Sequence, residues 1–215
     1  VEGDPNYKPI RMTVMGMAGS GKTVLVKTLI TIVRRMFQSR RAAYVCAPTG
    51  AAAFNSGGVT IHRLCSMNPS NTGKDRITDK EKEKLVEQFF DTILLIVDER
   101  SMVDFQTLGR AEVAVRESTR DGKFSDRSWG DLPGVVLIGD DMQLPSVDKG
   151  TLFMQVGPKK DRGKFNPKNN VQLNGYNAFL EASKDVMVLN TIKRQDESEK
   201  DYKDALDGLR YDRLT

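Results

Sequence analysis

The run GMAGSGKT at residues 16–23 constrains this chain more than any other segment. A glycine, four variable positions, then glycine, lysine and a hydroxyl residue form a loop whose backbone can cradle phosphates. Gly16 and Gly21 are expected to allow a tight turn that aims backbone N–H groups at phosphate oxygens. Lys22 is expected to reach the β- and γ-phosphates, and the Thr23 hydroxyl to ligate Mg²⁺. The loop residues expected at the phosphates are Gly16, Ala18, Gly19, Ser20, Gly21, Lys22 and Thr23.

The residues around this loop support a nucleoside triphosphate site over a solvated glycine-rich turn. Met12, Val14 and Met15 precede it and predict a strand. After it, apolar residues recur at helical spacing. Strand, glycine loop and helix is the setting that the site requires, and the helix N-terminus adds its positive dipole end.

Along the whole chain, apolar β-rich runs alternate with helical patterns, which is typical of a parallel sheet covered on both faces. We expect an α/β fold with a central, mainly parallel sheet flanked by helices. The predicted strands are residues 11–15, 42–47, 92–97, 135–138 and 186–189. The predicted helices are residues 22–38, 50–55, 79–90, 104–117, 176–182 and 197–209, with Thr78 or Asp79 capping the third.

Three polar stretches interrupt this alternation, at residues 68–84, 118–131 and 157–170. Loops of this length in a compact domain are usually functional or disordered. A functional loop and a solvated excursion both remain open for each of them.

Composition bounds the function only loosely. The 215 residues suit one α/β domain, with or without an insertion. The 33 Lys plus Arg against 29 Asp plus Glu, a net charge of +4, permit a nucleic-acid partner without requiring one. Cys46 and Cys65 lack zinc-site spacing and are expected to fill the core of an intracellular protein. No apolar run reaches the roughly 18 residues that cross a bilayer, so no membrane partner is expected.

Asp98 and Glu99 follow the apolar run 93–97 and should lie at the carboxyl edge of the sheet, where ligands bind in such folds. Asp98 is expected to hold Mg²⁺ through a water, and Glu99 to polarise the water that attacks the γ-phosphate. Acidic residues often simply end strands, but the combination with the phosphate loop favours catalysis.

A second polar run, GDDMQLP at residues 139–145, follows the fourth strand. The Gln143 amide could hydrogen-bond both the γ-phosphate and the attacking water. The alternative is a turn in which Gly139 supplies unusual backbone angles and Asp140 makes a local side-chain turn. Spacing alone leaves the two interpretations open.

The segment APTGAAAFNSGGVTIHRL, residues 47–64, combines small residues with the neutral hydrogen-bonding groups of Thr49, Thr60 and His62. Such a surface would suit a sugar-phosphate chain. His62 is the only histidine, and a structural role for it is favoured over catalysis. Near the end, LNTIKRQ places Arg194 after the last strand, either as a γ-phosphate ligand or as an exposed basic residue.

In this order the segments resemble the PIF family of superfamily 1 DNA helicases, relatives of the RecD-like group. GMAGSGKT is similar to helicase motif I, APTGAAAFNSGGVTIHRL to motif Ia and its continuation, VDERSMVD to motif II, GDDMQLPSV to motif III and LNTIKRQ to motif IV. The resemblance covers most of residues 11–210. It implies a RecA-like P-loop NTPase domain that uses ATP and Mg²⁺.

The resemblance also implies residue roles. It assigns catalysis to Lys22, Asp98, Glu99, Gln143 and Arg194, with Mg²⁺ on Thr23 and Asp98 and Arg194 as the arginine finger. Pro48, Thr49, Gly50 and His62 would line the single-strand path, with contacts mostly to backbone and stacked bases. The implied activity is 5′ to 3′ movement along single-stranded DNA with unwinding of duplexes and forks.

Several positions depart from the family pattern. Asp141 stands where a phenylalanine is usual, Ser146 where a proline is usual, and Arg100 where an apolar residue is usual. A PFGG-like stretch is reduced to residues 131–134. The adenine-recognising glutamine motif does not appear before Arg11, and nothing resembling the family follows motif IV.

We therefore expect a fragment, also because the chain begins with Val1. Residues 1–10 would be a tail, and 11–190 the first motor domain, with an insertion near 66–84 that is either a strand-separating wedge or a solvated loop. Residues 191–215 would lead toward a second motor domain. The expected parent is a monomeric, intracellular helicase, in the nucleus or mitochondrion if eukaryotic and in the cytoplasm if bacterial or viral. Alternatives are a non-catalytic helicase-derived binding module and a P-loop phosphotransferase without translocation.

Overall fold

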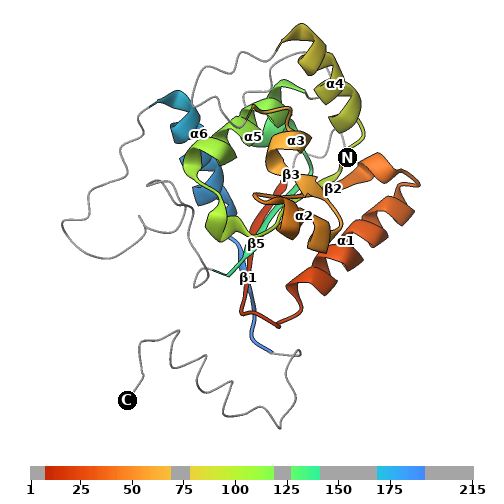
Figure 1. The fold of residues 1–215 in the computed structure, drawn as a ribbon, viewed down its shortest axis with the longest axis vertical. Coiled ribbons are helices and arrows are strands. Elements are labelled where there is room, and N and C mark those ends of the chain that lie inside the picture. The colour runs from red at the N-terminus through yellow and green to blue at the C-terminus, as the bar shows by residue number, and fades with distance from the viewer. Residues whose placement is uncertain (1–7, 69–77, 119–126, 141–168, 192–215) are drawn as a thin grey trace, which may run out of the picture.

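Six strands form one sheet in the computed structural model, in the order β3-β2-β4-β5-β1-β6, and every pair of neighbouring strands is parallel (Figure 1). The structure describes residues 8–68, 78–118, 127–140 and 169–191. The strands are β1 (Ile10–Gly16), β2 (Ala43–Ala47), β3 (Val59–Thr60), β4 (Leu94–Val97), β5 (Gly134–Gly139) and β6 (Val186–Leu189). The α/β fold and the sheet expected from the sequence are confirmed.

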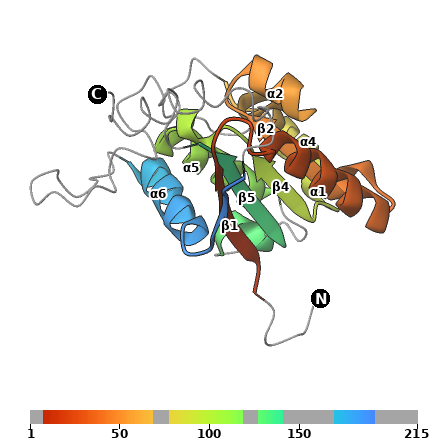
Figure 2. The same ribbon diagram turned by 90° about the horizontal axis from the view of Figure 1, so that it is seen from below.

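Helices cover both faces of the sheet, with α1 on one side and α5 and α6 on the other (Figure 2). The α-helices are α1 (Lys22–Met36), α2 (Gly50–Ser56), α3 (Ile61–Leu64), α4 (Asp79–Phe89), α5 (Phe105–Glu117) and α6 (Asn170–Ala182). Three 3-10 helices are η1 (Arg40–Ala42), η2 (Arg100–Met102) and η3 (Ser128–Asp131).

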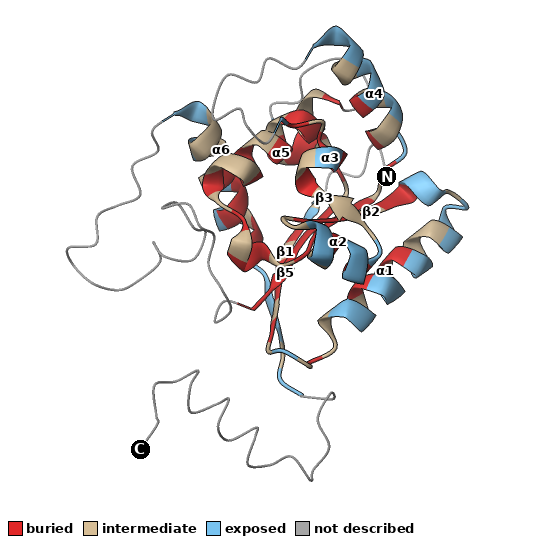
Figure 3. Ribbon diagram, viewed as in Figure 1, coloured by how far each residue is buried: buried red, intermediate tan, exposed pale blue. Residues whose placement is uncertain are grey.

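The central strands alternate their side chains between two cores. On β4, Leu95 and Val97 face the larger core beneath α3 to α6, whereas Leu94 and Ile96 face the smaller core beneath α1. Because successive strand residues point to opposite faces, a strand buried on both sides must be apolar at every position. Figure 3 shows the contrast between the helices, since α5 is buried or intermediate along its whole length whereas α1 is exposed on its outer side.

Two glycines set the closest helix packing. A Cβ atom at Gly109 of α5 would overlap the carbonyl oxygen of Val171, and one at Gly175 of α6 would overlap the carbonyl oxygen of Phe105. The backbones of α5 and α6 therefore touch with no side chain between them. Phe105 completes the contact through edge-on packing with Tyr176 and Phe179.

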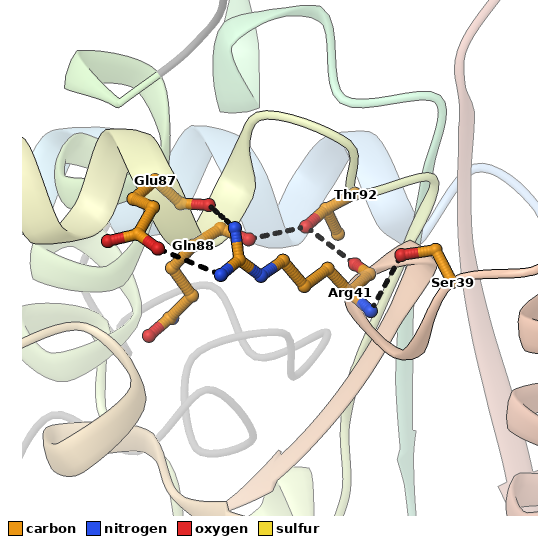
Figure 4. Close-up of polar contacts among 5 residues, drawn as sticks. All are labelled: Ser39, Arg41, Glu87, Gln88 and Thr92. Atoms are coloured by element: carbon orange, nitrogen blue, oxygen red, sulfur yellow. Dashed lines mark hydrogen bonds and ion pairs between the residues drawn. The ribbon is translucent and has the colours of Figure 1, made fainter.

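Polar contacts tie the end of α4 to the residues that lead into β2 (Figure 4). The buried Thr92 hydroxyl donates to Arg41 O at 3.0 Å, and Arg41 donates to the Glu87 carbonyl and carboxylate. The exposed Arg41–Glu87 ion pair is worth at most about 1 kcal/mol. The Thr92 hydrogen bond is buried, and it holds the segment just before β4 against the segment that leads into β2.

Several elements differ from their predicted bounds. Helix α6 begins six residues earlier than expected, because the Asn169 side chain caps it by accepting from Gln172 N. Thr78 rather than Asp79 caps α4, with a reciprocal bond from Glu81. The short β3 and α3 were not predicted. The predicted helix 197–209 lies outside the described residues.

The stretch 118–131 does not end as a solvated loop. Trp129 is 1% exposed, with its backbone N–H donating to the buried Glu112 carboxylate at 3.1 Å. Burial raises the pKa of Glu112, which Arg116 and the Trp129 N–H oppose. Trp129 is therefore part of the core and Gly130 is buried beside it, whereas residues 119–126 lie outside the described residues.

Alanine substitutions should test the glycine contact between α5 and α6. Gly109→Ala and Gly175→Ala each improve helix propensity by about 1 kcal/mol, yet they force a methyl group into a backbone carbonyl. We expect a net loss of about 1–3 kcal/mol in the free energy of unfolding, measured with urea. Gly50→Ala is the matched control, because a Cβ there meets nothing within 4 Å. Equal stability of all three variants would contradict the packing.

Candidate nucleotide-binding site

The parallel sheet brings the candidate residues to one edge. In β4, β5 and β1, which are adjacent, the carboxyl ends lead into Asp98, Asp140 and the phosphate loop respectively. The register pairs Val97 with Leu137 and Met15 with Gly139, so these ends lie within two residues of one another across the sheet. This is the edge where ligands bind in open α/β sheets.

Two glycines of the phosphate loop need a left-handed backbone. Gly19 has φ 82° and Gly21 has φ 92°, and Gly21 is the N-cap of α1. Gly16 is needed for a different reason from the predicted turn, because it is the last residue of β1. A Cβ atom there would overlap the Ser20 hydroxyl and lie 3.1 Å from Leu189 Cβ. The loop thus folds back closely over the end of its own strand.

Lys22 lies at the start of α1 and turns back over the loop. Its Nζ donates to Gly16 O at 2.7 Å and to Met17 O at 3.0 Å. Its positive charge lowers the pKa of both Asp98 and Glu99, although burial is the larger influence on each. The predicted lysine and the two predicted carboxylates are therefore brought together, while Thr23 is exposed one residue along α1.

Asp98 is the more buried of the two carboxylates, at 6% exposure. Its backbone N–H donates to Cys46 O at 2.8 Å, and its Oδ1 accepts from Glu99 N at 3.0 Å. Burial raises the pKa of Asp98. The Glu99 N–H, Lys22 and a hydrogen bond from Ser56 of α2 oppose that rise.

Glu99 takes a left-handed backbone conformation, φ 52° and ψ 47°, which is uncommon for a residue with a side chain. This angle turns the chain from β4 into η2 directly after Asp98. Burial raises the pKa of Glu99, and the negative charges of Asp98 and Asp140 raise it further. Three carboxylates therefore lie near one lysine.

The surroundings of Arg100 accommodate a charged side chain at a position where an apolar residue is usual. The residue is 4% exposed, and its guanidinium lies over the Phe179 ring, 5.7 Å from the centroid. A Cβ atom at Gly139 would lie 2.8 Å from Arg100 Cγ. The alternative in which Gly139 supplies unusual backbone angles does not hold, since its φ is not positive. The glycine is required because η2 packs against it.

The expected DNA-binding residues lie in α2 and α3 or directly before α2. Thr49 Oγ1 caps α2 by accepting from Ala52 N at 3.2 Å, which leaves its O–H as a donor. Pro48 is half-buried and Gly50 is exposed at the first position of α2. Burial lowers the pKa of His62, and the Arg110 charge lowers it further against the opposing effect of Asp104. His62 is thus a neutral imidazole at pH 7.

Two residues contribute to this site without having been singled out for it. Ser56 is the last residue of α2, and its hydroxyl lowers the pKa of Asp98 while donating to Ala52 O at 2.8 Å. Asp140 acts on Glu99, whose pKa its charge raises. Helical spacing places Ser56 on the side of α2 opposite Gly50, but only the fold shows that this side meets Asp98. Gln143 and Arg194 lie outside the described residues.

The loop suits a phosphate group. The Ser20 hydroxyl is buried and has no hydrogen-bond partner among the described residues, although a buried hydroxyl normally has one. It lies over Gly16, beside the lysine and at the N-terminus of α1. A phosphate oxygen would supply the partner that Ser20 lacks.

Comparison with known proteins agrees with this geometry. A model of the AAA domain family matches residues 6–149. The ATP-dependent DNA helicase RRM3 of Saccharomyces cerevisiae is 33% identical over 136 residues, which cover 62% of this chain and 18% of that protein. The ATP-dependent DNA helicase PIF1 of Candida albicans is 33% identical over 138 residues, 63% of this chain and 14% of that protein.

This chain belongs to the AAA domain family, and it is similar to Pif1-family DNA helicases. The solved structure of Bacteroides Pif1 bound to ssDNA has a TM-score of 0.63 and 27% identity, and the match covers 96% of this chain and 44% of that one. Bacteroides Pif1 in complex with ADP-AlF3 and ssDNA gives a TM-score of 0.63 and 29% identity, over 96% and 43%. The chain spans less than a fifth of the length of the curated relatives RRM3 and PIF1.

The cysteines fit the expected structural role. Cys46 and Cys65 are free and buried, and burial raises the pKa of the Cys65 thiol to about 12. Among the described residues, no helix is both long and apolar enough to cross a bilayer.

The raised pKa of Glu99 should be visible in the pH dependence of stability. A carboxyl with a higher pKa in the folded chain binds more protons folded than unfolded, so its contribution to the free energy of unfolding falls as pH rises above the ordinary value of 4.5. Glu99→Gln removes that contribution. The variant should therefore gain stability relative to the unchanged chain between pH 4.5 and pH 7, measured by urea unfolding.

The control is Glu83→Gln, which removes a carboxyl of the same residue type from the exposed side of α4. A Glu99→Gln variant whose stability runs parallel to that of the unchanged chain across this pH range would contradict the assigned burial effect.

Proposed function

We propose that this chain is the ATP-binding motor domain of a Pif1-type DNA helicase that moves 5′ to 3′ on single-stranded DNA and unwinds duplexes. The observation that carries the proposal is the meeting of Lys22 with Asp98 and Glu99 beside the phosphate loop. Two relatives are named ATP-dependent DNA helicases, and one structural relative was solved with ADP-AlF3 and ssDNA.

ATP would be held by its phosphates. The loop residues Gly16, Ala18, Gly19, Ser20 and Gly21 would donate backbone N–H groups, with the Ser20 hydroxyl as a further donor. Lys22 would exchange its bonds to the Gly16 and Met17 carbonyls for phosphate oxygens. The same lysine already lies near the carboxylates, so phosphate and metal would be bound side by side.

Thr23 and Asp98 would hold Mg²⁺, whose chemistry here is to neutralise charge on the phosphates. Glu99 would take the proton of the attacking water, and its raised pKa makes it a stronger base than an exposed glutamate. The Glu99 N–H holds Asp98 Oδ1 at 3.0 Å, which keeps the carboxylate oriented toward the site edge. Gln143 and Arg194 are proposed to contact the γ-phosphate, Arg194 as an arginine finger.

Single-stranded DNA would lie across α2 and α3. Pro48, Thr49, Gly50 and His62 are proposed to line its path, with the free Thr49 O–H and the neutral His62 ring as donors to the backbone. Such contacts position the strand without reading its sequence. DNA forks are the proposed substrate, and the parent is proposed to be an intracellular monomer.

A superfamily 1 motor hydrolyses ATP between two RecA-like domains. We propose that residues 11–190 supply one of them, after a tail at 1–10, and that 191–215 lead toward the other. The insertion near 66–84 is proposed as a strand-separating wedge. By this proposal the 215-residue chain alone has weak nucleotide binding and little ATPase, whereas the parent has DNA-stimulated ATPase.

Steady-state ATPase of the parent protein, with and without single-stranded DNA, tests the proposal. Lys22→Ala should lower the DNA-stimulated rate by on the order of 10²-fold or more, because a charge aimed at the phosphates is lost. Lys27→Ala, at an exposed position one turn along α1, is the control and should keep the rate. Normal turnover by Lys22→Ala would sink the phosphate assignment.

Glu99→Gln should separate binding from hydrolysis. Removing a general base typically lowers a rate by about 10²–10⁴-fold. A fluorescent ATP analogue should still bind with Mg²⁺, at an affinity close to that of the unchanged parent. Undiminished turnover by this variant would contradict a catalytic Glu99.

A further inference from the structure

Phe54 is the most exposed large apolar side chain among the described residues, at 85%. It belongs to α2, whose Ala53 and Ser56 are each 3% exposed and form the inward side. Phe54 therefore points away from both cores. A single exposed aliphatic residue is common on protein surfaces. A highly exposed aromatic ring beside a candidate binding path is instead a candidate ligand contact.

The ring lies on the same face of α2 as the expected DNA contacts. Gly50 and Phe54 are four residues apart and so are neighbours on the helix surface. A Cβ at Gly50 would meet nothing within 4 Å, so this face is open beside the ring. The Thr49 cap lies at the start of the same helix, and α2 packs against β3, which leads into α3 and His62.

We propose that Phe54 is a base-stacking residue that receives a nucleobase of the single strand bound along Thr49, Gly50 and His62. The inference rests on the proposed function and adds an exposed phenyl ring to a set, Pro48, Thr49, Gly50 and His62, in which only the His62 imidazole is aromatic. Those residues offer small or polar groups suited to the sugar-phosphate backbone, whereas a phenyl ring offers only a π-face. Every base has a π-face, so Phe54 strengthens binding without selecting a sequence.

The position also distinguishes Phe54 from other exposed apolar residues. Phe90 is aromatic and 50% exposed, but it caps the C-terminus of α4. Val24, Ile32 and Met36 project from α1 and are aliphatic, so they cannot stack on a base. Phe37 is aromatic and 51% exposed, but it caps the C-terminus of α1, at the end away from the phosphate loop. Phe37 therefore serves as a matched control.

Fluorescence of the 215-residue chain provides a direct test. The only tryptophan in the chain, Trp129, is 1% exposed and gives a constant background. In Phe54→Trp, oligo(dT) at low salt should cause a saturable loss of the added fluorescence, because the indole stacks on a base. In Phe37→Trp the same oligonucleotide should cause no loss.

Affinity measurements separate the contribution of the nucleobases to DNA binding from that of the sugar-phosphate backbone. Anisotropy of a dye-labelled oligo(dT) should show about 5- to 100-fold weaker binding by Phe54→Ala, and near-normal binding by Phe54→Tyr. An abasic oligonucleotide of equal length should bind the unchanged chain and Phe54→Ala alike. Urea unfolding of Phe54→Ala should match that of the unchanged chain, since the ring is exposed.

The outcomes separate this inference from the function on which it rests. If the unchanged chain binds oligo(dT) but Phe54→Trp is not quenched and Phe54→Ala binds normally, stacking is overturned and the DNA-binding proposal stands. If the unchanged chain shows no anisotropy change even at low salt, the DNA-binding proposal fails, and stacking fails with it.

Discussion

The parallel pairing of β4, β5 and β1 sets the position of every polar group at the candidate site. Their carboxyl ends meet at one edge, so the chain leaves the sheet three times at neighbouring positions. That pairing depends in turn on strands that are apolar on both faces and on helices that cover them. The site is therefore a consequence of how the two cores are filled.

The pKa values of the two carboxyl groups at this edge depend on burial and on the nearby Lys22 charge. Asp98 and Glu99 are pushed toward higher pKa values by burial, and Lys22 opposes this for both. A buried carboxylate without a nearby cation would favour protonation and lose its value as a metal ligand or base. The lysine thus has a role in the unliganded chain as well as in the proposed binding of phosphate, because it keeps charged the groups with which it would act.

The sequence was sufficient for the elements with strong local signals. Residues 16–23 predicted the loop, and four-residue or longer apolar runs predicted five of the six strands. It failed where the deciding contact is distant or the element is short. The two residues of β3 show no periodicity, the early start of α6 depends on the Asn169 cap, and Gly139 is required by a residue of η2 rather than by its own angles. Ser56 and Asp140 became site residues only once α2 and β5 were placed beside β4.

Helix α2 joins two parts of the molecule through its ends. Thr49 caps its start, on the side proposed for the strand, while the Ser56 hydroxyl at its last position lowers the pKa of Asp98. Seven residues make only two turns, too few to absorb a push by bending. A displacement of the first turn would therefore move the Ser56 hydroxyl at the other end and change its influence on Asp98. Helix α2 thus couples the proposed strand path to the candidate metal ligand.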